Sequence, residues 1–204
     1  MGPGTLLRVA GVGQLRAGRA ADALADAGAS RLVSCGFAGG LDPGLRPGEV
    51  VLAGTVICPG GETLPTDPGW QDWLAGRLEG VRRGALLSVA APVAERAARQ
   101  RLHQAHAALA VDMESAAVAR VAARRGLPFA ALRVVLDPAQ MSLPDAALSA
   151  LDPAGRLRAG RLAGSLLRSP AQVVPLLRLA LYTRHAEAAL RGLARKLEQG
   201  WGPS

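Results

Sequence analysis

The chain of 204 residues has few aromatic residues, only one lysine (Lys196) and no long uninterrupted apolar run. Aromatic residues are 3% of the sequence although hydrophobic residues are 50%. The core must therefore consist of Ala, Val and Leu packed around Gly, which favours a layered α/β protein. No stretch approaches the roughly 18 apolar residues of a membrane span. The first residues, MGPGTLLRVAGVG, lack the apolar core and cleavage site of a signal peptide.

These features predict one cytoplasmic domain over residues 1–204, with a core at 6–140 and a helical C-terminal part at 143–199. Cysteine is also scarce. Cys35 and Cys58 lie in apolar surroundings without CxxC spacing, so we expect reduced, buried thiols and no disulfide.

The formal net charge of +8 raises the question of an anionic partner. The basic residues are scattered, and no aromatic residues lie among them to stack on bases, so we do not expect nucleic-acid binding. In the last helix, Ala186 and Leu190 share an apolar face with Leu193 and Leu197, and arginines follow the opposite face. Such helices can pack their leucines on the sheet, which we favour, or attach peripherally to the inner membrane surface.

The pattern of apolar runs and glycine turns predicts alternating strands and helices. Strands are expected at 6–10, 31–41 with a glycine-rich loop at its end, 50–57, 84–91 and 129–136. Helices are expected at 15–27, 70–78 and 93–108, and the chain looks helical after about residue 143. The run at 129–136 is apolar apart from Arg133. A strand of this kind is covered on both faces, as in a mostly parallel sheet.

Two acids mark the start of another apolar helix, AVDMESAAVARVAA, at 110–123. We expect Asp112 to be the N-cap, with its carboxylate satisfied by free backbone N–H groups. Glu114 then shares a face with Val118 and Val121 and points towards the sheet, where a carboxylate needs a partner. Backbone N–H groups and the hydroxyls of a ligand are both suitable partners.

A third acid, Asp137, directly follows the apolar strand at 129–136. Ligands of open α/β sheets bind beyond the carboxyl ends of strands, and an acid held there has a raised pKa and can donate a proton. Asp137 can also simply open a turn with Pro138. The glycines of SCGFAGGL allow a close backbone approach, and the N–H groups of such a loop can cradle an anion. GVGQLRAG lacks the spacing of a dinucleotide-binding motif.

The order of VSCGFAGGLDPGLRPGEVV, VDMESAAVA and a strand ending in Asp resembles the nucleoside phosphorylase superfamily, which includes purine nucleoside phosphorylases and methylthioadenosine/S-adenosylhomocysteine nucleosidases. Together with PGGETLPTDPGW and APVA, the sequence looks most like the hopanoid-associated phosphorylases. The likeness runs from about Val9 to Gln140. It implies a three-layer αβα fold with a mixed, mostly parallel sheet that lacks the usual first strand.

The resemblance also implies roles for individual residues. Glu114 would bind the ribose hydroxyls, Met113 would pack on the sugar, and Asp137 would protonate the purine. Ser34 and Arg31 would contact phosphate. The remaining residues implied to line the substrate pocket are Gly36, Phe37, Ala38, Gly39 and Val93.

The implied activity is cleavage of the N-ribosidic bond of an adenosine-type nucleoside, adenosylhopane being the implied substrate, by phosphorolysis or hydrolysis. A methylthioadenosine/S-adenosylhomocysteine nucleosidase and a non-catalytic nucleoside-binding homologue are the alternatives. Neither a metal nor a redox cofactor is implied, phosphate is a possible co-substrate, and a homo-oligomer is expected because relatives complete their pockets across a subunit interface. Two departures from the family are the start near the second strand and Leu136 where many relatives have serine.

Overall fold

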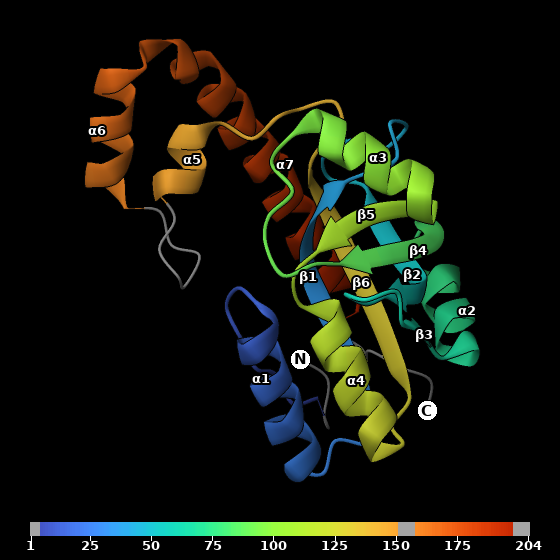
Figure 1. Ribbon diagram of the computed structural model, residues 1–204. Coiled ribbons are helices and arrows are strands. Elements are labelled where there is room, and N and C mark those ends of the chain that lie inside the picture. The colour runs from blue at the N-terminus through green and yellow to red at the C-terminus, as the bar shows by residue number, and fades with distance from the viewer. Residues whose placement is uncertain (1–4, 151–157, 198–204) are drawn as a thin grey trace.

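The computed structural model describes residues 5–150 and 158–197 (Figure 1). The described residues form six strands and seven α-helices around a single sheet. The strands are β1 (Leu32–Gly40), β2 (Val50–Ile57), β3 (Thr63–Pro65), β4 (Arg82–Ser88), β5 (Ala108–Asp112) and β6 (Phe129–Asp137). The helices are α1 (Gln14–Asp26), α2 (Pro68–Arg77), α3 (Arg96–His106), α4 (Ser115–Arg125), α5 (Asp145–Ala150), α6 (Ala159–Arg168) and α7 (Val173–Lys196), with a 3-10 turn, η1 (Pro170–Gln172), before α7.

The sheet is mixed and strongly curved. Its order is β3-β2-β4-β5-β1-β6, and β2 also pairs with β6, so that five strands close into a ring. Among the described strands, β1–β6, β2–β4 and β4–β5 pair in parallel, and β1–β5, β2–β3 and β2–β6 pair antiparallel. The predicted α/β fold with a mixed sheet is confirmed, with as many antiparallel as parallel pairings.

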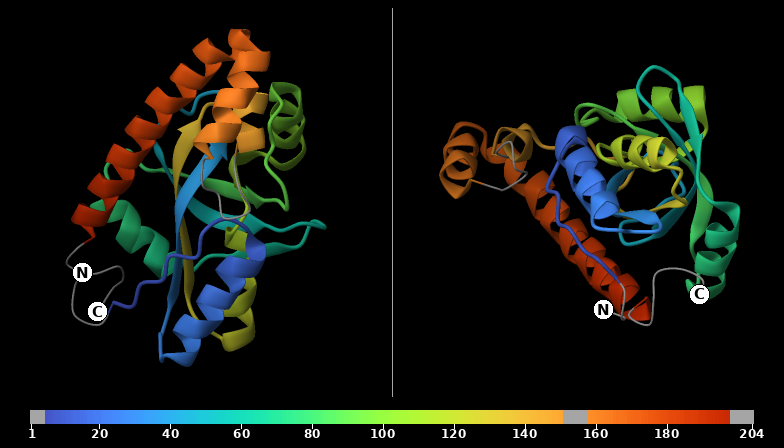
Figure 2. Two further views of the ribbon diagram at one scale, coloured as in Figure 1. Left: turned by 90° about the vertical axis from the view of Figure 1, so that its left-hand side faces the viewer. Right: turned by 90° about the horizontal axis from the view of Figure 1, so that it is seen from below.

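Helices cover the sheet on two sides (Figure 2). Ala17 and Ala21 of α1 and Val118 and Val121 of α4 join the core cluster on one side. The other cluster contains Trp70 of α2 together with residues of α7. Small residues dominate where α1 meets α4, so these two helices approach each other closely. Close approach of this kind fills the core without large aromatic side chains.

The second half of α7 packs on the sheet as its pattern predicts. Ala186, Leu193 and Leu197 are buried, whereas Arg191 and Arg195 are exposed. Residues 151–157 and 198–199 of the predicted helical C-terminal part lie outside the described residues. None of the helices in the described ranges is both long and apolar enough to cross a membrane.

The predicted strand at 6–10 is not formed. Residues 5–10 have no regular secondary structure, and the side chains of Leu6, Leu7 and Val9 are exposed. Apolar character predicts a strand only if a neighbouring strand offers hydrogen-bond partners, and no described strand pairs with these residues. In the described residues, the first element of the chain is therefore α1 and not a strand.

The glycine-rich segment after the predicted strand at 31–41 is not a loop. β1 continues through these glycines to Gly40, paired with β6 in regular register as far as Ala38. The glycines provide space for side chains. A Cβ atom on Gly36 would lie 3.5 Å from the Arg133 guanidinium, and one on Gly39 would lie 3.5 Å from that of Arg99.

The two cysteines differ in environment. Cys58 is buried, in agreement with the prediction, but Cys35 is exposed. Cys35 follows the buried Ser34 on β1, and because successive side chains of a strand point to opposite faces, it lies on the other face. Both thiols are free.

Candidate active site

The acids of the DMES segment lie at the junction of β5 and α4. β5 ends at Asp112 and α4 begins at Ser115, so the helix starts three residues later than expected and Glu114 is the residue that precedes it. Asp112 Oδ2 accepts a hydrogen bond from the backbone N–H of Ser115 at 3.0 Å. The N-cap of α4 is therefore Glu114 and not Asp112, so the predicted cap position is wrong. Asp112 still accepts a hydrogen bond from the first N–H of the helix, although this is only part of what its carboxylate does.

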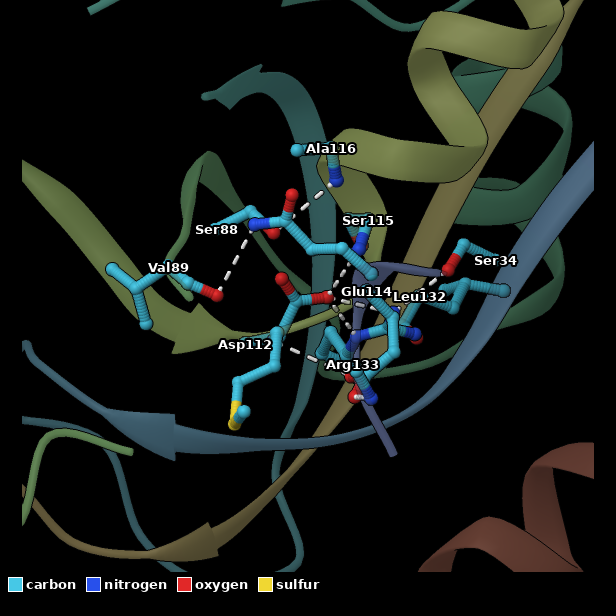
Figure 3. A network of polar contacts seen from close by, with 12 residues as sticks. Ser34, Ser88, Val89, Asp112, Glu114, Ser115, Ala116, Leu132 and Arg133 are labelled. Carbon is cyan, nitrogen blue, oxygen red and sulfur yellow. Dashed lines mark hydrogen bonds and ion pairs between the residues drawn. The ribbon is translucent and has the colours of Figure 1, made fainter. Parts of the chain in front are cut away.

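Asp112 also forms a buried ion pair with Arg133 of β6 (Figure 3). Arg133 Nε and Nη2 each lie 2.7 Å from Asp112 Oδ2, and both residues are almost wholly inaccessible to solvent. Nη2 also donates to Ser34 Oγ at 2.7 Å, and Nη1 donates to the carbonyl oxygen of Leu132. A buried charge is tolerated only when it is paired and hydrogen-bonded, and this network meets both conditions.

Arg133 was missed as a site residue by sequence reasoning. Its signal was present, because it is the single charged side chain before Asp137 in an otherwise apolar strand. A buried guanidinium requires an acid nearby, and Asp112 was available as its partner. Within the described residues, Asp112 Oδ1 and Ser115 Oγ are buried without a hydrogen-bond partner. Unpaired buried polar atoms of this kind mark positions where a bound group can add a hydrogen bond.

Glu114 lies beside this network and is partly buried. Its Oε1 accepts from the backbone N–H of Gly13 at 2.8 Å, and its Oε2 accepts from that of Met113 at 3.3 Å. Gly13 directly precedes α1, so the carboxylate connects the starts of α1 and α4. Burial raises the pKa of Glu114 above its usual value, the bond from Gly13 opposes this shift, and the negative charge of Asp112 adds to it.

Asp137 forms a second buried pair, with Arg99 of α3. The two side chains are 4% and 2% exposed. Arg99 Nε donates to the carbonyl of Val93 at 2.9 Å, and Nη1 donates to that of Pro138 at 3.2 Å. Burial raises the pKa of Asp137 above its usual value, and the guanidinium of Arg99 opposes this shift without cancelling it. The expected position and raised pKa of Asp137 are therefore found.

Arg99 was also missed, since in the sequence it is one of several arginines in a polar helix. Its role depends on Gly39, which pairs with Asp137 in the sheet and leaves room for the guanidinium above β1. Val93 is brought near the site through its carbonyl, as a hydrogen-bond acceptor for Arg99. No signal in the local sequence distinguishes Arg99 from its neighbours, because the contact joins segments almost forty residues apart.

Two predicted phosphate ligands have other partners. Ser34 Oγ accepts from Arg133 in the middle of β1. The Arg31 guanidinium lies over the ring of Trp70, 5.7 Å from its centroid. Arg31 precedes the first residue of β1, roughly 30 Å along the strand from Gly40. The structure therefore does not bring Arg31 to the acids, because they lie beside the opposite end of β1, where Gly39 pairs with Val111 and Asp137.

The glycine backbone does not form the expected cradle. Gly36, Phe37, Ala38 and Gly39 lie within β1 and face β6 across a paired ladder. Their N–H groups are arranged as in a strand, not as in an anion-binding loop, because β1 extends to Gly40. Instead, the glycines leave space for two buried arginine side chains. Arg133 packs against Gly36, and Arg99 packs against Gly39.

Comparison with known proteins places this arrangement in a family. The profile described as the phosphorylase superfamily matches residues 5–168, well over half of the chain. The chain belongs to the phosphorylase superfamily. All of the acids and arginines described above fall within the matched residues.

Named relatives of this phosphorylase-superfamily chain include 5′-methylthioadenosine/S-adenosylhomocysteine nucleosidases. Those from Mycobacterium bovis and Mycobacterium tuberculosis are each 30% identical over 65% of this chain and 69% of theirs. Among solved structures, a Helicobacter pylori 5′-methylthioadenosine nucleosidase with 5′-methylthioadenosine in its active site matches with a TM-score of 0.65 and 16% identity, covering 92% of this chain and 77% of that one.

A second solved structure, the S-adenosylhomocysteine nucleosidase of Streptococcus pyogenes with 5-methylthiotubericidin, matches with a TM-score of 0.60 and 24% identity. The alignment covers 64% of each chain, so this protein spans under two thirds of that relative. At these identities the solved structures establish the fold. The family and the named relatives make nucleoside N-glycosidic bond cleavage the chemistry to which the chain is related.

Proposed function

We propose that the protein cleaves the N-ribosidic bond of a 5′-substituted adenosine by hydrolysis, releasing adenine. The observation that carries this proposal is the pairing of Asp137 with Arg99 at the carboxyl end of β6, in a phosphorylase-superfamily chain that also has Glu114 beside a second buried network. In this proposal Asp137 donates a proton to the leaving base, and Glu114 binds the hydroxyls of the sugar.

The proposed proton donor is Asp137. An anionic purine is a poor leaving group, so proton transfer to the ring as the bond to C1′ breaks lowers the barrier, typically by a factor of about 10² to 10⁴. Burial raises the pKa of Asp137, so its carboxyl holds a proton more readily than that of a free aspartate. The electron pair of the broken bond remains on the purine, which leaves as neutral adenine.

The proposed sugar ligand is Glu114, with Met113 packing on the ribose. As the base departs, the ribosyl carbon becomes oxocarbenium-like, and a carboxylate that holds the sugar hydroxyls stabilises this developing charge. Arg133 and Asp112 support the segment from which Glu114 projects, because they fix the end of β5. Arg133 packs against Gly36 and Arg99 packs against Gly39. These two glycines are three residues apart along β1, or roughly 10 Å, a distance that one nucleoside and its flanking side chains can bridge.

Water is the proposed acceptor at C1′. The expected phosphate ligands Ser34 and Arg31 are used in other contacts, and the glycine segment is a strand. The named relatives are nucleosidases. Water attacks the face of the sugar opposite the departing base, a C–O bond forms at C1′, and the proton of the water passes to solvent. The products are adenine and a 5-substituted ribose.

Methylthioadenosine and S-adenosylhomocysteine are the proposed substrates, because the relatives carry those names. Adenosylhopane, which the likeness to hopanoid-associated phosphorylases suggested, is the second candidate. The observation in its favour is the exposed aliphatic face of α6 and α7, which suits a site that receives a lipid-bearing nucleoside. A homo-oligomer belongs to the same proposal, because the family resemblance implies pockets that are completed across a subunit interface.

The deciding experiment incubates the purified full chain with methylthioadenosine, S-adenosylhomocysteine or detergent-dispersed adenosylhopane, each with and without phosphate. Adenine is quantified by chromatography, and the sugar product by mass. We expect adenine and the free sugar regardless of phosphate. Formation of a sugar 1-phosphate in the presence of phosphate would show that the reaction is phosphorolysis and that the proposal of hydrolysis is wrong.

Asp137→Asn is the matched variant for this assay, and Asp72→Asn, which changes an exposed acid of α2, is its control. We expect the first to lose at least about 10²-fold in kcat/KM and the second to retain full activity. Release of no adenine from any substrate, combined with tight binding of adenosine by calorimetry, would show a nucleoside-binding homologue without turnover instead.

A further inference from the structure

The first half of α7 exposes aliphatic side chains to solvent. Val173, Val174, Leu177 and Leu181 are 41%, 57%, 61% and 54% exposed. Their spacing places them within one arc of about 100° on the helix surface. Single exposed leucines are common on proteins, but a stripe of four along one helical face is not explained by chance exposure.

The same arc has a different character in the second half of the helix. There it carries Arg191 and Arg195, both exposed, while Leu193 and Leu197 on the opposite face pack on the sheet. The helix therefore has an ordinary amphipathic second half and a first half whose outward arc is apolar. A charged outward arc, as in the second half, is expected where a helix faces water. An apolar outward arc, as in the first half, is not.

α6 continues this surface. Leu167 is 86% exposed, and none of the residues of α6 is buried. Figures 1 and 2 show α6 and the beginning of α7, with α5 beside α6, extending away from the sheet. We call the exposed residues Leu167, Val173, Val174, Leu177 and Leu181, with the arginines next to them, the outer face.

The segment that carries the outer face has charged residues of one sign. Residues 153–186 contain six arginines and no acidic residue. Among them, Arg161, Arg168, Arg178 and Arg184 are exposed. Arginines beside exposed leucines are the pattern of helices that lie in a membrane interface, where the aliphatic groups enter the acyl region and the guanidinium groups meet anionic headgroups.

We propose that the outer face binds the surface of an anionic lipid bilayer, with Leu167, Leu177 and Leu181 inserted below the headgroups. A second copy of the chain fits this face less well, because a twofold contact would set arginines against arginines. The binding is peripheral, and it does not depend on the reaction proposed above.

The test measures co-sedimentation of the full chain with vesicles of phosphatidylcholine alone and of phosphatidylcholine with 30% phosphatidylglycerol. Three double variants are compared with the unmodified protein: Leu177→Ser with Leu181→Ser, Arg178→Gln with Arg184→Gln, and the control Arg191→Gln with Arg195→Gln. The control removes the same charge from the same helix outside the outer face. All six positions are exposed, so the fold should persist in each variant.

We expect binding to the anionic vesicles, lost by at least about tenfold in the first two variants and little changed in the control, since each arginine near an anionic surface contributes roughly fivefold. Equal loss in the control would overturn the proposal, as would absence of binding by the unmodified protein. If the leucine variant converts an oligomer into a monomer in light scattering, without any vesicle binding by the unmodified protein, the face belongs to a second copy and the proposal is wrong.

Discussion

Arg99 and Asp137 meet above Gly39, a residue without a side chain, so that a helix and a strand end share one buried ion pair. A Cβ atom at position 39 would be in ordinary van der Waals contact with the guanidinium, at 3.5 Å, so the pair packs directly against the backbone of Gly39. The pair ties α3 to the carboxyl end of β6. It also sets the charge environment of the proposed proton donor.

The first prediction concerns that charge environment. Arg99→Gln removes the positive charge that opposes the raised pKa of Asp137, so this pKa should rise further. A general acid works while it is protonated, and the alkaline limb of the kcat/KM profile should therefore move to higher pH. Arg99→Lys keeps the charge and should leave the limb close to that of the unmodified protein. An unchanged limb in both variants would show that Arg99 has only a structural role.

The second prediction concerns Glu114 and stability. Its pKa in the folded protein is raised above the ordinary 4.5, so the stability that it contributes is fully present below that value and is lost as the pH rises through the raised pKa. Glu114→Gln removes this dependence. The free energy of unfolding of the variant, relative to the unmodified protein, should therefore increase between pH 4 and neutrality in urea titrations.

Glu79→Gln serves as the control for Glu114, because Glu79 is exposed. It should shift the unfolding free energy by the same small amount at every pH. A flat difference for Glu114→Gln as well would contradict the raised pKa. In the enzymatic assay, Glu114→Gln should raise KM, because ribose binding is weakened, and lower kcat, because the developing charge on the sugar loses its stabilisation.

The third prediction concerns the Asp112–Arg133 pair. Arg133→Met leaves a buried carboxylate without its counter-charge, which should lower the free energy of unfolding by about 3–5 kcal/mol. The double variant Arg133→Met with Asp112→Asn removes both charges and should lose less than the sum of the single variants. Urea denaturation of the four proteins measures the coupling, and additive losses would show that the two side chains act independently.

The fourth prediction concerns packing between β4 and β5. A Cβ atom on Gly84 would lie 2.6 Å from Leu109 Cδ1 and 2.7 Å from its Cγ. Gly84→Ala should therefore destabilise the protein by about 1–3 kcal/mol through overpacking. Gly192→Ala in α7 has no atom within 4 Å of the new Cβ, and should stabilise by about 0.5–1 kcal/mol. Thermal unfolding compares the two, and equal effects would disprove the contact.

Strands with a clear apolar pattern were predictable because their signal is local. The strands expected at 50–57 and 129–136 are found as Val50–Ile57 and Phe129–Asp137. The run at 6–10 has the same composition but no neighbouring strand, and it does not form one. A strand depends on its partner as well as on its own residues, so pattern alone cannot distinguish the two cases.

The acids of the candidate site could also be predicted from local sequence, but their arginine partners could not. Asp137 follows from its place after a strand, where open sheets bind ligands, and the acids of the DMES segment follow from their place at the start of an apolar helix. Arg99 and Arg133 do not, because each meets its acid across twenty or more residues of chain. The glycines were read as a flexible loop, although their function in the structure is to leave space for these arginines.

The sequence by itself determined the α/β class, the acids and the amphipathic second half of α7, since these depend on composition and on the period of neighbouring residues. Only the tertiary structure decided which charges are paired, how far β1 extends and which half of α7 is left uncovered. Those features depend on the curvature of a sheet that closes β2 against β6, and hence on contacts between segments that no local pattern relates.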